Sequence, residues 1–255
     1  MNDVEKFAEI VDEAARTASA IPQFTEKGPL SVADAYAVQA ASIERRLKRG
    51  ETLVGVKMGL TSRAKMRQVN VDEVVWGRLT DAMRLEEGAS LSRRRYVHPR
   101  IEPELAFLLK APLAGEVTAA EAMAAVGGIA PAMEVIDSRY QNFKFALPDV
   151  IADNSSSSGF VVGDWSRPDQ DFSNLGLVME VNGRPVEIGS TAAILGNPAR
   201  SLVAAARLAG AALGRLEAGF IVLAGGATAA HSLKVGERVR LVMQNLGSVS
   251  IRVAE

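Results

Sequence analysis

Residues 98–107 read His-Pro-Arg-Ile-Glu-Pro-Glu-Leu-Ala-Phe, and the predicted fold is built outward from this stretch. Glu102 and Glu104 stand two residues apart, at the start of an apolar run that predicts a strand over residues 105–109. Successive side chains of a strand point to opposite faces, so both carboxylates share one face if the strand register extends back to them. The stretch therefore predicts a strand that presents two acids on the same side.

A third acid, Glu134, lies in a second apolar run over residues 133–136. Three carboxylates that are brought together repel one another unless a cation lies between them. Oxygen ligands favour a hard divalent ion such as Mg²⁺ or Mn²⁺. A pair of glutamates at this spacing also occurs on solvent-exposed strand faces, so the spacing by itself leaves both interpretations open.

The composition limits the classes of function. The chain has 255 residues, enough for one large domain or two smaller ones. Its net charge of −1 gives no basic surplus for binding a phosphate backbone, so nucleic acid is not an expected partner. The absence of cysteine excludes disulfides, thiolate nucleophiles and zinc–thiolate sites. Only His98 and His231 could supply imidazole, so a metal must be held mainly by carboxylates and water.

The sequence has no signal for export or membrane insertion. Residues 1–6 lack the basic start and apolar core of a signal peptide, and no apolar run reaches the roughly 18 residues that a membrane span needs. We therefore expect a cytoplasmic protein that does not enter the membrane.

Helical patterns dominate the N-terminal part of the chain. Residues 3–19 carry apolar side chains at helical spacing, and a second helix is predicted to begin at Ser31, with Asp34 completing a capping box, and to end near Gly50. These patterns predict a small N-terminal helical lobe over residues 1–52, followed by a β-rich catalytic domain over residues 53–255.

The predicted strand over residues 53–59 contains Lys57 between two apolar residues. A half-buried ammonium group is costly unless it is paired. Lys57 either points outward from an edge strand or points into a site and meets an anion. Downstream, residues 63–70 are compatible with a helix, and residues 76–81 read as loop and turn.

The remaining two-thirds of the chain predict a mixed α+β fold with many strands. Thr118 and Glu121 form a capping-box pattern that predicts a helix ending at Gly127-Gly128, and Asn182-Gly183 predicts a hairpin turn. The other predicted elements are a strand leading into loop over 134–140, strands at 150–152 and 160–162 around a serine run, a helix over 199–213, a strand over 220–224, and strands over 238–243 and 248–253. Together they suggest a rolled β-sheet or barrel.

The chain resembles the 2-oxopent-4-enoate hydratase/4-oxalocrotonate decarboxylase family, whose fold is similar to the C-terminal domain of fumarylacetoacetate hydrolases. The resemblance covers nearly the whole length and rests on spaced motifs at residues 55–62 (GVKMGLTS), 99–107 (PRIEPELAF), 134–140 (EVIDSRY), 152–154 (ADN) and 246–249 (LGSV). The decarboxylase branch looks closer, because Val75 stands where hydratases tend to carry an acid, and because residues 75–81 and 224–228 resemble the decarboxylase forms.

The resemblance implies a set of site residues. It maps the metal ligands for Mg²⁺ or Mn²⁺ onto Glu102, Glu104 and Glu134, and the active-site lysine onto Lys57. It places the active-site serine at Ser156, with the register among residues 155–158 open by one. The other expected pocket residues are Leu60, Gly225 and Thr228, with Val75 and Trp76 as candidates to line its apolar part. Apart from the resemblance, His98 could act as a base but is expected to be exposed or to pack, and a direct role is expected still less for His231. Asp81 and Arg139 are expected to make structural hydrogen bonds, although either could reach the site.

The implied reaction is metal-dependent decarboxylation of 4-oxalocrotonate in the meta-cleavage catabolism of aromatic compounds. Lys57 could supply positive charge to the substrate or act as a proton donor. The alternatives are a 2-hydroxypenta-2,4-dienoate hydratase with the same metal centre and a non-catalytic subunit that binds a 2-oxo acid. The resemblance also suggests a homo-oligomer and a complex with the hydratase of the same pathway.

Overall fold

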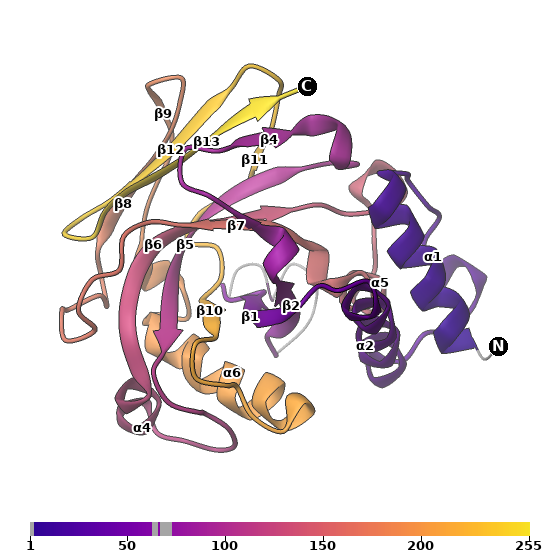
Figure 1. Ribbon diagram of the computed structural model, residues 1–255, viewed down its shortest axis with the longest axis horizontal. Helices are drawn as coiled ribbons and strands as arrows, with labels where there is room; N and C mark the ends of the chain where they lie inside the picture. The colour runs from indigo at the N-terminus through magenta and orange to yellow at the C-terminus, as the bar shows by residue number, and fades with distance from the viewer. Residues whose placement is uncertain (1–2, 63–65, 67–72) are drawn as a thin grey trace.

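The computed structural model describes residues 3–62, 66 and 73–255, and its centre is a curled mixed sheet (Figure 1). The strand order is β2-β1-β10-β5-β6-β7-β3, and β11 pairs with β5. The strands are β1 (Leu53–Gly59), β2 (Val75–Thr80), β3 (Arg84–Leu85), β5 (Arg100–Leu109), β6 (Val126–Ile136), β7 (Ser157–Val162), β10 (Ile221–Leu223) and β11 (His231–Ser232). Parallel and antiparallel pairs both occur, since β1 is parallel to β10 and antiparallel to β2.

The long antiparallel pair β5–β6 forms the middle of this sheet. Its register runs from Arg100 opposite Ile136 to Leu109 opposite Val126. Ile101, Leu105 and Phe107 of β5 are completely buried, as are residues along β6, and they belong to one hydrophobic core. Because both faces of the pair are covered, side chains of either face are shielded from solvent, and this includes the acidic ones.

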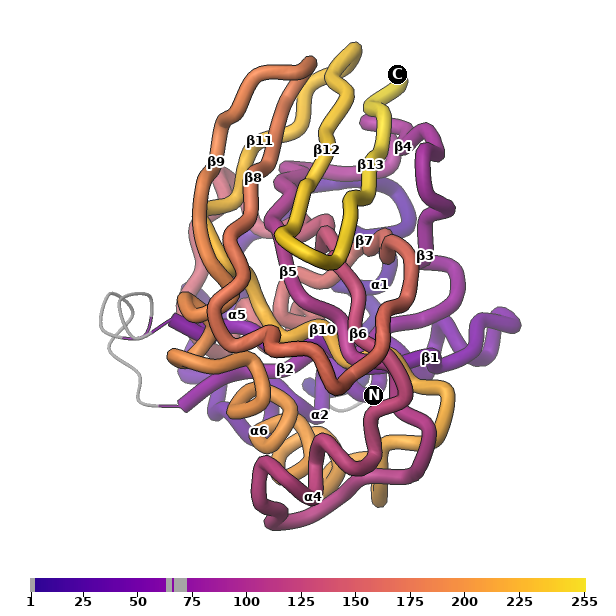
Figure 2. The backbone as a smooth tube through the Cα atoms, turned by 90° about the vertical axis from the view of Figure 1, so that its left-hand side faces the viewer, coloured from indigo at the N-terminus to yellow at the C-terminus, as the bar shows by residue number. Residues whose placement is uncertain are grey.

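A second, five-stranded sheet packs against this core with the order β4-β13-β12-β8-β9. Figure 2 shows β8, β9, β12 and β13 at one end of the molecule and α4 and α6 at the opposite end. The strands are β4 (Ser90–Ser92), β8 (Gly176–Val181), β9 (Arg184–Ser190), β12 (Arg238–Met243) and β13 (Gly247–Ala254). The predicted hairpin at 182–183 is confirmed, and both turn residues have the positive φ that Asn and Gly tolerate.

The predicted C-terminal helix is α6 (Pro198–Leu213), and Asn197 caps it by accepting a hydrogen bond from the backbone N–H of Ala199 at 2.9 Å. The N-terminal helices are α1 (Asp3–Thr17) and α2 (Val32–Lys48), and Ser31 caps α2 as expected. Together with α5 (Leu147–Ala152), they lie on one side of the curled sheet (Figure 1).

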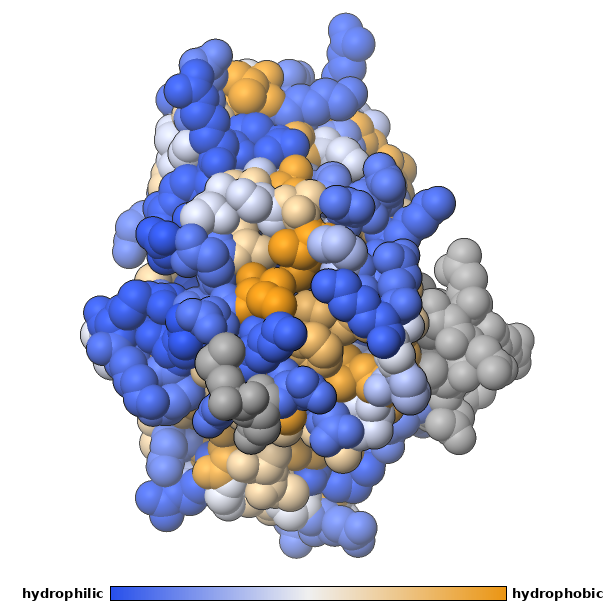
Figure 3. Space-filling model, turned by 90° about the vertical axis from the view of Figure 1, so that its right-hand side faces the viewer, coloured by the Kyte–Doolittle hydropathy of each residue, from blue (hydrophilic) through white to orange (hydrophobic). Residues whose placement is uncertain are grey.

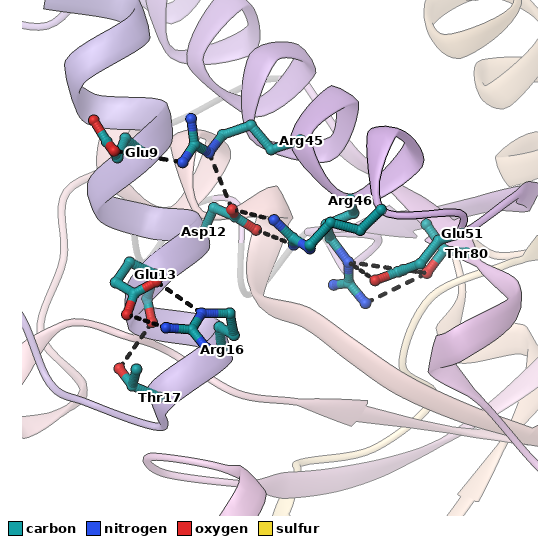
Figure 4. A network of polar contacts seen from close by, with 10 residues as sticks. Glu9, Asp12, Glu13, Arg16, Thr17, Arg45, Arg46, Glu51 and Thr80 are labelled. Carbon is teal, nitrogen blue, oxygen red and sulfur yellow. Dashed lines mark hydrogen bonds and ion pairs between the residues drawn. The ribbon is translucent and has the colours of Figure 1, made fainter.

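A buried carboxylate joins the two N-terminal helices. Asp12 of α1 is 4% exposed and accepts a hydrogen bond from Arg45 of α2 (Figure 4). It also accepts hydrogen bonds from Arg49, which follows the last residue of α2. Gln39 on the other side of α2 donates hydrogen bonds to the carbonyls of Trp76 and Ile151, so the helices are also tied to the sheet. The division into a lobe at 1–52 and a catalytic domain at 53–255 remains a proposal.

Three sequence predictions were wrong. Residues 76–81, expected as loop and turn, lie mostly in β2, where six register pairs with β1 impose an extended backbone. Residues 150–152, expected as a strand, end the helix α5, which Asp149 caps by accepting from the N–H of Ala146. The helix that begins after Thr118 ends at Ala124, and Gly127-Gly128 belong to β6, where pairing with β5 overrides their tendency to end a helix.

Two further points concern the limits of the described chain. The helix predicted over residues 63–70 lies outside the described residues except for Met66. Among the helices of the described residues, none combines the length and the apolar character that crossing a bilayer would require.

Candidate metal centre and active site

Three glutamates from the two central strands converge in the interior. Glu102 lies directly opposite Glu134 in the β5–β6 register, and Glu104 follows Glu102 on the same face. One carboxylate oxygen from each residue lies within 4.8 Å of the other two. Their exposed fractions are 7%, 0% and 0%, so the prediction that the three carboxylates share one centre is confirmed, and the alternative of a solvated strand face is wrong.

Lys57 reaches this cluster from β1. Its Nζ lies 3.0 Å from Glu134 Oε2 and donates a hydrogen bond to the carbonyl of Ser155 at 3.1 Å. The side chain is 4% exposed, so Lys57 points into the site and meets an anion there. The other interpretation, a lysine pointing outward from an edge strand, is wrong.

The charges of the cluster are strongly coupled. Burial raises the pKa of Glu104 well above its usual range, and the neighbouring carboxylates of Glu134 and Glu102 raise it further. Burial also raises the pKa of Glu134, against the opposing effect of Lys57. Burial by itself would lower the pKa of Lys57, but the three carboxylates outweigh it and the pKa is raised. Ionising all three carboxylates would therefore place more negative charge in the cluster than the ammonium group of Lys57 can balance.

The donor atoms of this cluster fit a hard divalent cation. Glu104 Oε1 and Glu134 Oε1 are fully buried and accept no hydrogen bond from any described residue. Buried carboxylate oxygens normally have partners, so unsatisfied oxygens that converge need a cation. An all-oxygen set matches Mg²⁺ or Mn²⁺. We therefore consider the three glutamates to be candidate ligands.

A glycine pair closes one side of the cluster. The N–H of Gly225 donates to Glu104 Oε2 at 2.7 Å and fixes that carboxylate. Gly225 has φ +105°, and a Cβ there would lie 2.1 Å from Thr61 Oγ1. A Cβ on Gly226 would lie 2.3 Å from Glu102 Oε2. Only glycine fits at both positions, because the loop backbone approaches the carboxylates directly.

The serine run forms a strained turn on the other side. Asn154, Ser155 and Ser156 have φ values of 50°, 50° and 61°, so three successive non-glycine residues occupy the left-handed region. The hydroxyls of Ser155 and Ser158 bond within the protein, to the carbonyls of Trp76 and Ser156. The hydroxyl of Ser156 is buried and has no hydrogen-bond partner in the described chain, which leaves it available to a ligand.

The sequence did not predict what holds this turn. Asn154 Oδ1 accepts from the N–H of Arg78 at 2.8 Å, and its Nδ2 donates to the carbonyl of Arg78 at 2.9 Å. The side chain thus pairs with the edge of β2 as another strand would. Gly77 leaves room for this contact, because a Cβ there would lie 2.5 Å from the carbonyl oxygen of Asn154. Asn beside a serine run was the available signal, since Asn tolerates a positive φ.

The remaining expected pocket residues surround the cluster less closely. Leu60, which has φ 56°, follows β1 and is half-buried. Thr228 donates to the carbonyl of Ala229, and its methyl group would meet a Cβ on Gly189 of β9. Val75 and Trp76 of β2 are buried, with exposed fractions of 6% and 3%. Only Val75 shares the face of Lys57, because Gly77 pairs with Lys57 and the intervening Trp76 points to the opposite face, so the expectation that Trp76 lines this pocket is wrong.

Four residues that were weighed for a role in the site make contacts within the protein, and those of Asp81 and Arg139 are the expected hydrogen bonds. The Nδ1 of His98 lies 3.0 Å from the carbonyl of Ser138, and His231 pairs with Glu237. Asp81 accepts hydrogen bonds from the backbone and hydroxyl of Thr52. Arg139 pairs with buried Asp153, whose pKa burial raises to about 7 against the opposing effect of Arg139.

Comparison with known proteins gives consistent matches along the chain. Residues 32–254 match the fumarylacetoacetate hydrolase C-terminal family. A 4-oxalocrotonate decarboxylase from Pseudomonas sp. is 55% identical over 247 residues, which cover 97% of this chain and 96% of that protein. Another from Pseudomonas putida is 41% identical, with 96% and 94% covered. The solved structure of 4-oxalocrotonate decarboxylase from Pseudomonas putida G7, complexed with magnesium and adipate, has a TM-score of 0.95 at 39% identity and covers 98% of this chain and 97% of that chain.

Proposed function

The chain belongs to the fumarylacetoacetate hydrolase C-terminal family, and we propose that it is a metal-dependent carboxy-lyase that releases CO₂ from 4-oxalocrotonate in aromatic meta-cleavage catabolism. The observation that carries this proposal is the buried cluster of Glu102, Glu104 and Glu134 with Lys57 against it. The identity of 55% to a protein of this activity supports the choice of substrate.

We propose that the three glutamates hold Mg²⁺ or Mn²⁺. The magnesium in the Pseudomonas putida G7 structure supports this choice of ion, as do the unsatisfied carboxylate oxygens of this chain. When bound, such an ion supplies Lewis acidity to the 2-oxo acid end of the substrate, where negative charge develops. With two positive charges from the ion and one from Lys57, the three carboxylates are neutralised.

The main catalytic requirement of this reaction is to stabilise the negative charge that develops on the 2-oxygen of the substrate. The bond between C5 and the C6 carboxylate breaks, and its electron pair moves through the carbon–carbon double bond to the 2-oxygen. The products are CO₂ and a dienolate, which takes up one proton to give 2-hydroxypenta-2,4-dienoate. Stabilising the developing oxyanion lowers the barrier most, because the charge forms in a site that excludes water.

Lys57 supplies a fixed positive charge for this step. The carbonyl of Ser155 and the carboxylate of Glu134 hold its ammonium group, so it needs no reorganisation when charge develops. We propose that Lys57 interacts with the substrate's carboxylate or enolate oxygen. We also propose that the hydroxyl of Ser156 and the loop at Gly225 to Thr228 orient the substrate.

The apolar part of the pocket suits loss of a carboxylate. A carboxylate is charged and CO₂ is neutral, so apolar surroundings favour the product. Leu60 and Val75 are the proposed lining residues. Decarboxylation needs no activated water, and an apolar Val75 in place of an acid is consistent with that.

The test is to supply 2-oxohex-3-enedioate with Mg²⁺ and to measure CO₂ release together with loss of the substrate's absorbance. We expect equimolar CO₂ and a five-carbon dienol. Conversion of the dienol to a 4-hydroxy-2-oxo acid without CO₂ release would identify a hydratase. In a parallel assay the dienol is supplied in place of 2-oxohex-3-enedioate. Binding of these two compounds without turnover of either one would identify a non-catalytic subunit. This outcome and the hydratase outcome would each contradict the proposal.

We further propose that the protein works in the cytoplasm as a homo-oligomer and in a complex with the hydratase of the same pathway. Val186 and Ile188 of the edge strand β9 are 40% and 75% exposed and offer apolar surface for association. Light scattering of the purified protein, with and without the hydratase, tests both assemblies. A monomeric mass in each case would contradict them.

A further inference from the structure

A cavity of about 710 Å³ lies behind the strand that borders the active site. It is formed by α2, β2, α5 and α6, and none of its lining residues belongs to the glutamate cluster, although Val75, which is proposed to line the apolar part of the active site, also borders it. Figure 3 shows the side of the molecule that carries α1 and α2, where a band of apolar surface runs between hydrophilic margins. We call this cavity the Arg78 groove, and its principal lining residues are Val32, Tyr36, Val74, Trp76, Arg78 and Leu208.

Successive side chains of β2 point to opposite faces of the strand, and this places the Arg78 groove and the metal centre on opposite sides of it. Lys57 lies opposite Gly77 in the β1–β2 register, so these two residues share one face of the sheet. Trp76 and Arg78, on either side of Gly77, therefore point to the opposite face. A ligand in the groove would contact the back of the strand whose front faces Lys57.

Arg78 is a buried cation for which no described residue supplies an anionic partner. It is 9% exposed, its Nη1 donates to the amide oxygen of Gln39 at 2.6 Å, and its guanidinium lies 4.6 Å from the ring centroid of Trp76. Within the described residues it pairs with no carboxylate. Burial lowers the pKa of Arg78 to about 10, so it remains charged at neutral pH. Buried charges are normally paired, because desolvation costs several kcal/mol.

The groups around Arg78 leave it open to an anion and to a flat ligand. Tyr36 stacks on Trp76 with ring centroids 5.5 Å apart, and its hydroxyl accepts a hydrogen bond from the N–H of Trp76 at 3.3 Å. Burial raises the pKa of Tyr36 to about 12, so the hydroxyl keeps its proton and can donate it. The acid that lines the groove, Glu73, is held by Arg207 at 2.8 Å and by the N–H of Val74.

We propose that the Arg78 groove is a second binding site, separate from the metal centre, for a small monocarboxylate with a flat apolar body. The carboxylate pairs with the free nitrogens of Arg78, for which a planar guanidinium gives a bidentate geometry. The apolar body packs against Val32, Val74 and Leu208 beside the Trp76 ring. Charge complementarity selects an acid over a neutral molecule, and the apolar walls select an aromatic or branched body over acetate.

Benzoate is a suitable probe, and benzamide is its uncharged counterpart. We would titrate both into EDTA-treated protein and follow binding by ligand-observed NMR. We expect saturable binding of benzoate with a Kd of about 1 mM, as a ligand of nine heavy atoms allows. Benzamide should bind at least about tenfold more weakly, since one charge-assisted contact corresponds to that factor. Equal binding of the two, or no saturation with benzoate, would overturn the proposal.

Variants locate the site. Arg78→Gln should weaken benzoate binding at least about tenfold. Arg78→Lys should weaken it less, because lysine keeps the positive charge and lacks only the planar guanidinium geometry. Ala40 also lines the groove, so Ala40→Leu adds side-chain volume there, keeps Arg78 and should also weaken binding. The test therefore stands if Arg78→Gln does not fold. The matched control is Arg94→Gln, an exposed arginine paired with Glu255, which should bind as the wild type does.

A glutamate variant separates this site from the proposed active site. Glu104→Gln should bind benzoate unchanged in the absence of metal, even though it damages the metal centre. If Glu104→Gln abolishes benzoate binding, or if Arg78→Gln and Ala40→Leu leave it unchanged, benzoate occupies another site and the inference is wrong. Neither result bears on whether the protein releases CO₂, so the two proposals fail independently.

Discussion

Lys57 Nζ lies 3.0 Å from Glu134 Oε2, although β10 and β5 separate the strands of these two residues in the sheet. Three strand spacings in a flat sheet amount to about 14 Å, which is more than a lysine side chain spans. The ion pair therefore depends on the curl of the sheet, visible in Figure 1, which brings β1 over the face of β5 and β6. The same curl buries the three glutamates and Lys57 in the interior.

Replacing Lys57 tests its role in the reaction. Lys57→Met keeps most of the side-chain volume and removes the positive charge. We expect kcat for CO₂ release to fall about 10²–10³-fold, the usual loss when a fixed electrostatic group at a developing oxyanion is removed. Steady-state assays with saturating Mg²⁺ measure this, and Lys48→Met, at a residue 73% exposed, is the matched control. A wild-type kcat in Lys57→Met would remove Lys57 from the mechanism.

Replacing Glu104 tests the metal site apart from the fold. Glu104 is fully buried with a raised pKa, so it destabilises the metal-free fold increasingly as the pH rises above its unfolded pKa, and fully above its folded pKa. Glu104→Gln removes this cost, and we expect metal-free protein that is at least as stable as the wild type. We also expect Mg²⁺ affinity to fall by at least about tenfold, because mutating residues that only hydrogen-bond to metal ligands already lowers metal affinity by about that factor. Calorimetric Mg²⁺ titration of Glu104→Gln against exposed Glu116→Gln measures the difference.

Metal removal should be visible in stability as well as in activity. A ligand at 100 times its Kd stabilises the folded state by about 2.7 kcal/mol. We expect Mg²⁺ to shift the urea midpoint of the wild type upward, and EDTA to reverse this and stop CO₂ release. Glu104→Gln should show little shift at the same Mg²⁺ concentration. Full activity in thoroughly chelated protein would contradict the metal role.

Part of this site could be predicted from the sequence. The two-residue period of a strand places Glu102 and Glu104 on one face, and this local rule needs no tertiary information. The meeting of Glu102 with Glu134 depends on pairing between residues 32 positions apart, whose register no local pattern gives. The family resemblance predicted that Glu102, Glu104 and Glu134 belong to one site, and the structure shows the strand register that brings them together.

Other features could not be predicted because tertiary contacts decide them. Residues 76–81 resemble a loop and turn, but residues 76–80 lie in a strand because β1 and the side chain of Asn154 bind its two edges. The left-handed turn at 154–156 contains no glycine, and Asn154 is its one local signal, which does not indicate that Ser155 and Ser156 also adopt a positive φ. The helix predicted to end at Gly127-Gly128 ends earlier, and these two residues lie in β6, since strand pairing outweighs the weak preference of glycine for helix ends.

Asn154 should position Lys57 through the turn that it holds. Asn154→Ala loses two hydrogen bonds to Arg78 and places alanine at φ 50°, so we expect a loss of about 2–4 kcal/mol in unfolding free energy. Displacement of the Ser155 carbonyl should lower kcat more than it changes KM. Asn154→Asp keeps the acceptor and should recover part of both effects. Equal kcat in all three proteins, measured at a temperature where each is folded, would show that the turn serves stability alone.

The ion pairs of Asp12 should make stability depend on pH below about 4. Burial would raise the pKa of Asp12, but hydrogen bonds from Arg49 and Arg45 outweigh it and the pKa lies below 3.8. A carboxyl whose pKa is lowered on folding stabilises the protein above its unfolded pKa of about 3.9, and this stabilisation is lost as the pH falls through the folded pKa. Because both arginines are partly exposed, we expect Asp12→Asn to cost about 1–3 kcal/mol at pH 7. Urea unfolding of both proteins at pH 7, 5, 4 and 3 measures the difference, which should be constant down to about pH 4 and shrink at pH 3. A difference that stays the same at pH 3 would mean that Asp12 acts through packing rather than through its charge.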